Sequence, residues 1–448
     1  MTGTAHHTPW PARAGRGTAG AGERWLLVAA VTLGVLLCGG PLALVALEAI
    51  APEGQPTLDP IADALDSRTT WRALLNSLDS ALFSGLIATA IGTAMALAVG
   101  LTDVRAKAPL VFLILLPMMI PPHVTAIAWI QALGPGGAVL GALGLAPGVG
   151  APNPLYSREG VIALLAIQHM PLAFLVVRAG LGALPREMVD AARVSGARPA
   201  RILRRIVLPL LAPNLIAALA LTVVSALGNF GIQALLGIPA RYTTLPVLMW
   251  RRLASFGPQV LSDLAVIAAI IALVAVAVVA VQLALQRRAR TALIGPPAAP
   301  LAFRLGRARP AVEVALWAWL ALVLALPLMS LTATALIPTY GVALTAETVT
   351  FENFREVLVR QAVTLRAFAN STLAAGMAAA VLAGFAVVLG YYLARPAGPA
   401  RRAAGGIAAL ADIAYAVPGL VISIAFILAF IRPLPVLGVS LYGSLAVI

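Results

Sequence analysis

The chain is dominated by apolar segments of about 20 residues, the length that crosses the hydrocarbon core of a membrane. Of its 448 residues, 61% are hydrophobic and 11% are charged, a balance that soluble domains of this length do not reach. Spans are expected near residues 25–48, 76–101, 109–133, 159–183, 212–236, 262–286, 312–336, 370–394, 406–431 and from about 437 onwards. The sequence therefore predicts an all-α polytopic membrane protein.

Basic residues concentrate in alternate connections between these segments, which accounts for the net charge of +14. By the positive-inside rule, the N-terminus and the connections near 102–108, 184–211, 287–311 and 395–405 lie in the cytoplasm. The outer connections are richer in acid, except for the basic 239–261 loop. This distribution indicates a lipid bilayer as the partner of the charges, and no nucleic acid.

The most informative connection is the basic loop from Pro185 to Pro209. Pro185 and Pro199 suit first helical turns, where a missing N–H costs nothing. Gly196 is expected to stop the first short helix because glycine accepts a positive φ. Pro209 is expected to end the second short helix before the next span.

The composition of the first short helix suits contact with another protein. Glu187 and Asp190 fall in its first turns, where they favour the helix dipole. Ala191 and Ala192 are small enough for a second backbone to approach closely. The alternative is an amphipathic connector lying on anionic lipid, but that role requires neither the small pair nor the glycine.

The order Asp190-Ala191-Ala192, then Gly196, then Ile206-x-Leu208-Pro209 resembles the cytoplasmic "EAA" loop of permease subunits in binding-protein-dependent ABC importers, with Asp190 in place of the family's glutamate. The resemblance implies a type I importer fold and a loop that docks onto an ATPase subunit. The coupling-loop residues are Glu187, Asp190, Ala191, Ala192, Gly196, Ile206, Leu208 and Pro209.

The chain also contains an internal repeat. The segment 71–81, with Asn76-Ser77, aligns with 365–375, and the segment 120–129, with Pro121, aligns with 417–426 around Pro418. Such a repeat resembles a fused permease with two tandem helical bundles. The expected division is a cytoplasmic tail (1–24), a first permease repeat (25–286, coupling loop 185–209), a basic cytoplasmic linker (287–311) and a second repeat (312–448). The second repeat is expected to be truncated before its own coupling loop.

Two further segments, 228–237 with 242–246 and 415–426, resemble fused permeases of ferric-iron importers. Ferric iron is therefore the expected substrate, and thiamine, phosphonate and polyamine permeases are alternatives with the same architecture. The resemblance implies two copies of an ABC ATPase subunit and a periplasmic solute-binding protein as partners. The chain lacks a phosphate-binding G-x-x-x-x-G-K-[ST] motif, so ATP and Mg²⁺ belong to the ATPase. We expect no enzyme activity and no cofactor in this chain, which would reside in the bacterial inner membrane.

Four polar residues fall within predicted spans: Gln168, His169, Asn229 and Gln233. Polar groups in a membrane face the bundle interior or a wet cavity. They are candidate pathway residues, although hydrogen bonding between helices is the simpler interpretation. His123 has no second ligand nearby, so no metal site is expected.

A secondary transporter driven by an ion gradient is the rival class, but such carriers often place acids at the membrane midplane. Here Asp and Glu avoid the centres of the spans.

Overall fold

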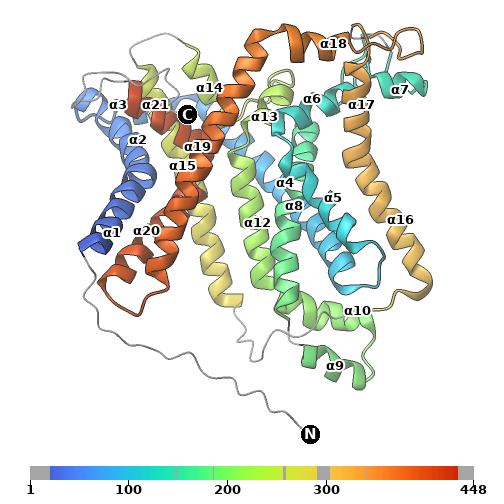
Figure 1. Cartoon of the computed structure of the whole chain (residues 1–448), viewed down its shortest axis with the longest axis horizontal. Helices are drawn as coiled ribbons and strands as arrows, with labels where there is room; N and C mark the ends of the chain where they lie inside the picture. The colour runs from blue at the N-terminus through green and yellow to red at the C-terminus, as the bar shows by residue number, and fades with distance from the viewer. Residues whose placement is uncertain are drawn as a thin grey trace.

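A computed structural model describes residues 21–431, apart from 146, 149, 185, 256–258, 290–302 and 340. Within these residues the chain is helical, and its only strand-like feature is one isolated bridge between Thr102 and Phe303. Figure 1 shows long helices that run between two ends of the molecule, with short connections at each end. The predicted all-α membrane bundle is confirmed.

The elements follow one another without a sheet. Those before the 290–302 segment are α1 (Ala21–Gly34), a π turn (Val35–Gly39), α2 (Gly40–Ile50), α3 (Asp59–Asp66), α4 (Arg68–Leu101), α5 (Lys107–Met119), α6 (Pro122–Leu133), α7 (Ala138–Ala142), α8 (Arg158–Gly182), α9 (Arg186–Val194), α10 (Pro199–Ile202), a π turn (Leu203–Val207), α11 (Leu208–Leu210), α12 (Ala212–Leu227), α13 (Phe230–Gly237), α14 (Leu245–Leu253) and α15 (Val260–Ala289). Those after it are α16 (Arg309–Leu320), a π turn (Ala321–Ala325), α17 (Leu326–Ala335), α18 (Glu352–Arg355), a π turn (Glu356–Arg360), α19 (Ala362–Leu393), α20 (Pro399–Ala416) and α21 (Gly419–Ile431). Short 3₁₀ turns cover Pro52–Gly54 and Gly306–Ala308.

Among the described residues, six helices are long and apolar enough to cross a membrane, or up to eight if each of two bent pairs counts as one span. Seven of these correspond to predicted spans. The fifth predicted span, 212–236, is instead divided into α12 and α13 at Gly228 and Asn229, and the bent pair there joins Pro199–Leu210 to Ala212–Leu227. The ninth, predicted as one span near 406–431, is instead two helices, α20 and α21, interrupted at Val417 and Pro418. The tenth lies outside the described residues.

The span predicted at 109–133 is sharply broken rather than straight. Helices α5 and α6 meet at an angle of 100°, because Pro121 and Pro122 supply no backbone N–H to continue the helix. The break leaves carbonyl groups without helical partners inside an apolar bundle, where each needs another donor. The side-chain amide of Gln168 donates to both Pro117 O and Ile120 O, at 3.0 Å each.

Helices α4, α8 and α12 form the centre of the first half. Their backbones come close because α4 presents small side chains on the buried face, including Gly85, Ala88 and Gly92. A Cβ added to Gly92 would lie 2.7 Å from Met170 O of α8, so this crossing depends on glycine. The main apolar core extends from these helices down to the loop that contains α9.

The first helices of each half also contact the other half. Helix α2 packs against α21, and α17 packs against α6. These contacts join residues on the two sides of the expected linker between the repeats. The division into two repeats therefore stays a prediction.

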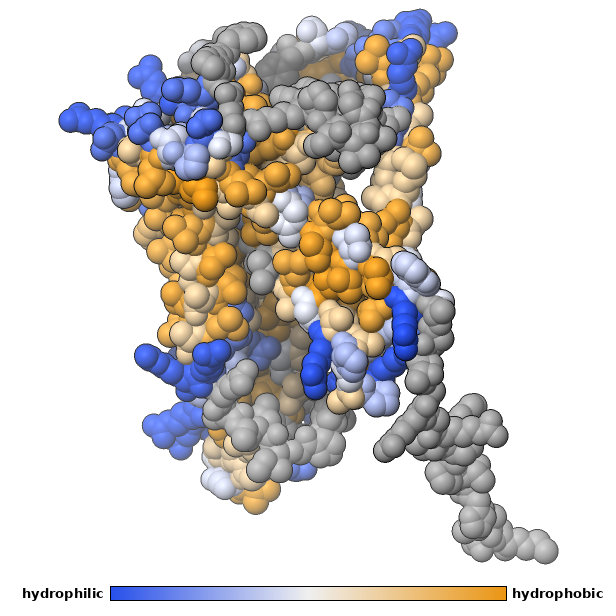
Figure 2. Space-filling view, turned by 90° about the vertical axis from the view of Figure 1, so that its left-hand side faces the viewer, coloured by the Kyte–Doolittle hydropathy of each residue, from blue (hydrophilic) through white to orange (hydrophobic). Residues whose placement is uncertain are grey.

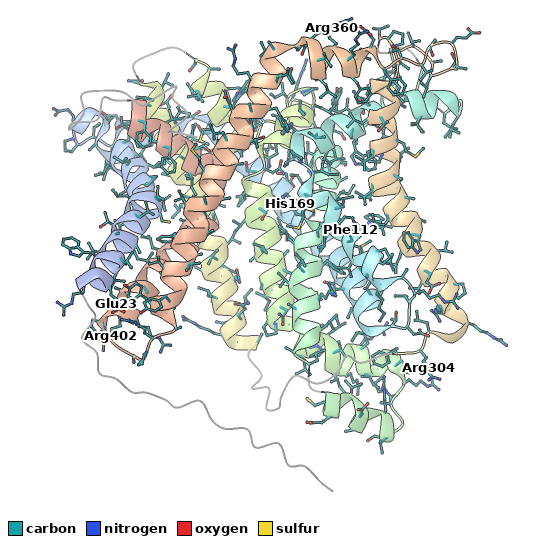
Figure 3. The ribbon with its side chains drawn as sticks, in the orientation of Figure 1. Glu23, Phe112, His169, Arg304, Arg360 and Arg402 are labelled. Carbon is teal, nitrogen blue, oxygen red and sulfur yellow. The ribbon has the colours of Figure 1, made fainter. Side chains whose placement is uncertain are left out.

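The charged side chains and the apolar surface separate along the bundle. Arg304 and Arg402 lie at the same end as α9, and Arg360 lies at the other end (Figure 3). On the face shown in Figure 2, hydrophobic side chains cover the middle and hydrophilic ones gather toward the two ends. This is the surface that a membrane-embedded bundle requires.

Candidate functional site

The predicted coupling loop projects from one end of the bundle as two short helices (Figure 1). Helix α9 runs from Arg186 to Val194, and Gly196 follows it with a φ of 72°. The Gly196 N–H donates to Arg193 O and the Ala197 N–H donates to Ala192 O, both at 2.9 Å, the paired bonds of a Schellman motif. The predicted glycine stop is confirmed; Pro185 lies outside the described residues. A Cβ on Gly196 would meet nothing within 4 Å, so the backbone angle requires the glycine.

Helix α9 has one face turned to the protein and one turned to solvent. Val189 is buried and Ala192 packs against the main core. Ala191 and Glu187 are exposed on the opposite face. Two large apolar residues of α9 are also exposed, Met188 at 46% and Val194 at 91%. Sequence reasoning missed these two, although the spacing 188, 191, 194 indicates one side of a helix.

The acidic residue of the motif lies beside a base of the same helix. Asp190 Oδ1 is 3.3 Å from Arg193 Nη1, in an ion pair one turn apart. Both side chains are partly exposed, so the pair contributes little to the stability of the fold. Further along the loop, Arg198, Arg201, Arg204 and Arg205 are exposed.

The second short helix of the loop ends one residue later than predicted. It begins at Pro199 and passes through α10, a π turn and α11 to Leu210, and the chain bends by 65° into α12. Pro209 therefore sits within the helical stretch. The preceding π turn, in which the Leu208 N–H donates to Leu203 O, accommodates the missing N–H of the proline. Ile206 and Leu208 are half-buried against the bundle.

The four polar residues within the spans all make hydrogen bonds in the bundle. Besides bridging the α5–α6 break, Gln168 accepts a bond from the Thr125 hydroxyl at 3.0 Å. His169, near mid-height in Figure 3, has Nδ1 2.8 Å from Leu165 O of the preceding turn. Asn229 accepts a bond from the Ile232 N–H and so caps α13, whereas Gln233 donates to Ala226 O at 2.8 Å.

These bonds explain how the polar groups are tolerated in a membrane. A role in lining a pathway remains a prediction for Gln168, His169, Asn229 and Gln233.

A cavity of about 470 Å³ lies between the two halves of the molecule. Helix α12 contributes Ala220, Val224 and Ser225, helix α15 contributes Gln282, and the α20–α21 break contributes Pro418. The described residues that line it carry no charge. The cavity brings together the segments that begin at Gly228 and surround Pro418, which are distant in sequence.

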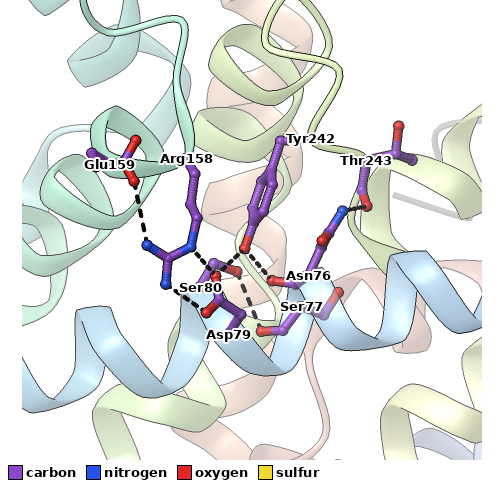
Figure 4. A network of polar contacts seen from close by, with 8 residues as sticks. All are labelled: Asn76, Ser77, Asp79, Ser80, Arg158, Glu159, Tyr242 and Thr243. Carbon is purple, nitrogen blue, oxygen red and sulfur yellow. Dashed lines mark hydrogen bonds and ion pairs between the residues drawn. The ribbon is translucent and has the colours of Figure 1, made fainter.

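At the other end of the bundle, a polar network joins α4, α8 and the loop before α14 (Figure 4). Arg158 binds Asp79 with two nitrogens, Nε to Oδ2 and Nη2 to Oδ1, each at 2.6 Å. The Tyr242 hydroxyl donates to Asp79 Oδ2 at 2.6 Å and to Asn76 O at 2.8 Å. The Asn76 amide in turn donates to Thr243 O at 2.9 Å. Burial and the bond to Asp79 raise the pKa of Tyr242, so its hydroxyl remains a donor.

This network gives a structural role to part of the repeated motif. The Ser77 hydroxyl oxygen accepts a bond from the Leu245 N–H at 2.8 Å, so Asn76-Ser77 holds the chain as it enters α14. The partnership of Asp79 with Arg158 was missed, since the two residues lie in different segments and no spacing pattern connects them. Among the described residues, no group of three or more His, Cys, Asp or Glu could hold a metal ion.

Comparison with known proteins finds similarity over part of the chain. Residues 88–291 match the family of the binding-protein-dependent transport system inner membrane component. A probable molybdenum ABC transporter permease protein of Haloferax volcanii is 30% identical over 168 residues, which cover 37% of this chain and 58% of that protein. The permease protein PhnU of Salmonella typhi, named for a 2-aminoethylphosphonate transport system, is 25% identical over 231 residues, covering 51% of this chain and 79% of PhnU. A chain of a bacterial ABC transporter involved in alginate import is similar in structure, with a TM-score of 0.48, 20% identity, and coverage of 60% of this chain and 96% of that chain.

The described bundle is all-helical, and residues 88–291 within it are similar to the inner-membrane components of binding-protein-dependent transport systems. The chain spans little more than half of the Haloferax relative, 58% of its length.

Proposed function

We propose that this chain is the transmembrane permease subunit of an ATP-driven importer, which passes a substrate from a periplasmic binding protein to the cytoplasm. The observation that carries the proposal is the solvent-facing side of α9, where Met188, Ala191 and Val194 form an apolar stripe. An exposed stripe on a short helix that projects from the membrane fits a groove on a partner protein. The partner is an ABC ATPase subunit.

The remaining partners follow from that docking. Two ATPase copies bind ATP and Mg²⁺ between them, and their closure moves the docked helices. The end of the bundle that carries α9 faces the cytoplasm, as does the N-terminus, in a bacterial inner membrane. The basic residues of several connections, including Arg304 and Arg402, gather at the same end (Figure 3) and support this orientation.

The cavity between the halves is the proposed site of passage. It lies where α12 and α15 meet the α20–α21 break, and relative movement of the halves would change its access. Ser225 and Gln282 offer polar groups without fixed charge. Selectivity would therefore rest mainly on the binding protein.

The backbone supports two tandem permease repeats. Helix α5 ends at Met119, and the next residue, Ile120, is extended, with φ −85° and ψ 126°, immediately before Pro121. Helix α20 ends at Ala416, and the next residue, Val417, is extended, with φ −85° and ψ 131°, immediately before Pro418. Ile120 and Val417 are aligned by the sequence repeat. In both places the next helix begins two residues later, at Pro122 and at Gly419.

Ferric iron remains the substrate that the motifs favour. The relatives described above are named for molybdenum and for 2-aminoethylphosphonate, so small oxyanions and phosphonates are the competing classes. Calorimetric titration of the cognate binding protein with ferric iron, molybdate and 2-aminoethylphosphonate would separate these classes.

Co-purification tests the docking. In the full chain expressed with its ATPase, Val194→Glu should lower recovery of the ATPase roughly tenfold or more, because a buried unpaired charge costs several kcal/mol at an interface. Val359→Glu is the control, since Val359 is 67% exposed and lies in the π turn at the opposite end. Ala192 is a less selective probe because it packs inward. Equal recovery for both variants would contradict the proposal.

A further inference from the structure

Residues 303–309, the described end of the basic linker, are bound to the connection between α4 and α5. The Phe303 N–H donates to Leu101 O at 2.6 Å, and Phe303 pairs with Thr102 in the isolated parallel bridge. The Leu305 N–H donates to Asp103 Oδ1 at 2.9 Å. This bond is the main reason that the pKa of Asp103 lies below its usual range. We name residues 303–309 the strap.

Ion pairs fix the far end of the strap to the same connection. Arg309 Nε is 2.9 Å from Glu313 Oε1, and Arg309 Nη1 is 3.9 Å from Asp103 Oδ2. Glu313 Oε1 also accepts a bond from the Arg105 N–H at 2.8 Å. The strap thus connects the end of α4 with the beginning of α16 through both backbone and side-chain contacts.

The strap also contacts the coupling loop. The guanidinium carbon of Arg193 lies 4.8 Å from the centroid of the Phe303 ring, within range of a cation–π interaction. Arg193 belongs to α9 and makes the ion pair with Asp190. Phe303, Leu305, Ala192 and Ala197 all pack against the same apolar core. Phe303 therefore touches the side of α9 that faces the protein and leaves its apolar stripe free.

We infer that the strap orients the coupling helix: Phe303 is a positioning residue that holds α9 through Arg193 and links its movement to α4 and α16. This inference rests on the proposed docking role of α9. Gly196 follows the end of α9, and a Cβ there would meet nothing within 4 Å. The contacts on the inner face of α9 therefore restrain the helix. Without the Phe303 ring, the docking stripe remains but α9 can rock about its C-terminal turn.

Hydrogen exchange in the full chain, purified without its ATPase, tests the orientation directly. Phe303→Ala should raise amide exchange in residues 187–197 roughly two- to fivefold, the loss expected for one cation–π contact. Phe303→Trp should restore slow exchange, because it keeps an aromatic face. Phe303→Leu keeps apolar bulk without a ring and should resemble Phe303→Ala, which separates stacking from packing. Phe351→Ala, at an exposed phenylalanine of the outer end, should change nothing in α9.

The ATPase-containing complex provides the second readout. Phe303→Ala should keep ATPase recovery near the wild-type level but lower the stimulation of ATP hydrolysis by loaded binding protein, and Phe303→Trp should restore it. Unchanged exchange in α9 for both Phe303→Ala and Phe303→Leu would overturn the inference. Failure of the wild-type chain to recover any ATPase would instead contradict the proposed function. The exchange experiment, which needs no ATPase, would still decide whether the strap restrains α9.

Discussion

Gly228 packs directly against Pro418 across the boundary between the two halves, so closely that a Cβ on Gly228 would lie 2.7 Å from the Pro418 Cβ. Both residues line the central cavity, and each belongs to a segment that sequence similarity to importer permeases singled out. The contact joins the end of α12 to the α20–α21 break. The two halves, whose relative movement the proposed transport cycle requires, can approach this closely here because residue 228 is a glycine.

Enlarging this glycine should impair transport. Gly228→Val forces the halves apart or strains Pro418, at a cost of about 1–3 kcal/mol for an overpacked core position. We expect a lower melting temperature and lower uptake, with ATPase recovery unchanged because α9 is remote from the substitution. Gly376→Val in α19 is the control, since a Cβ at Gly376 meets nothing within 4 Å. Equal uptake for the two variants would show that the contact has no role.

Gln168 should prove necessary for stability. Gln168→Leu leaves Pro117 O and Ile120 O without their amide donor at the α5–α6 break, and a buried unsatisfied group costs about 1–3 kcal/mol. Thermal unfolding in detergent should show a clear decrease in melting temperature. Gln131→Leu is the matched control, because Gln131 Oε1 is already buried without a partner among the described residues. A smaller decrease for Gln168→Leu than for Gln131→Leu would refute the bridging role.

Much of this fold could be predicted from the sequence, because the signals involved are local. The length of an apolar run sets a membrane helix, and the positive φ at Gly196 follows from the residue itself. The orientation of α9 could not be predicted. Helical periodicity groups Met188, Ala191 and Val194 on one side, but the contacts that turn Ala192 inward come from distant helices.

The angle of the α5–α6 break and the ion-pair partner of Arg158 also could not be predicted from the sequence. Pro121 marks a break without specifying its 100° angle, which depends on where Gln168 places its amide. Arg158 follows a loop, and the sequence alone allows it to pair with any acidic residue of the outer connections. Only packing of α4 against α8 puts Asp79 within 2.6 Å.

The outer network should stabilise the loop before α14. Tyr242→Phe removes the hydroxyl bond to the Asp79 carboxylate, which is worth about 1.5–3 kcal/mol for a bond to a charged group. Proteolysis of the 238–245 loop in intact membranes should become faster. Tyr156→Phe, at a partly exposed tyrosine near the same end, should leave the cleavage rate unchanged. Slower or equal cleavage in Tyr242→Phe would count against the network.

Reporter fusions should establish the orientation of the bundle. Fusions after Lys107, Arg198 and Arg402 should report a cytoplasmic location, and fusions after Asp63 and Gly148 a periplasmic one, because basic connections remain inside. A periplasmic signal after Arg198 would place α9 on the side where no ATP is available. The docking proposal would then fail.

Site-directed cross-linking of α9 tests the central claim most directly. Val194→Cys, in a chain whose single cysteine Cys38 is replaced by serine, places a thiol on the most exposed apolar position of the docking stripe. In membranes that contain the ATPase, a short bifunctional reagent should join this cysteine to the ATPase subunit, with an increase on addition of nucleotide. Val359→Cys at the opposite end should give no such product. Absence of the Val194 cross-link in an assembled, ATP-hydrolysing complex would contradict the assignment of α9 as the helix that couples ATP hydrolysis to transport.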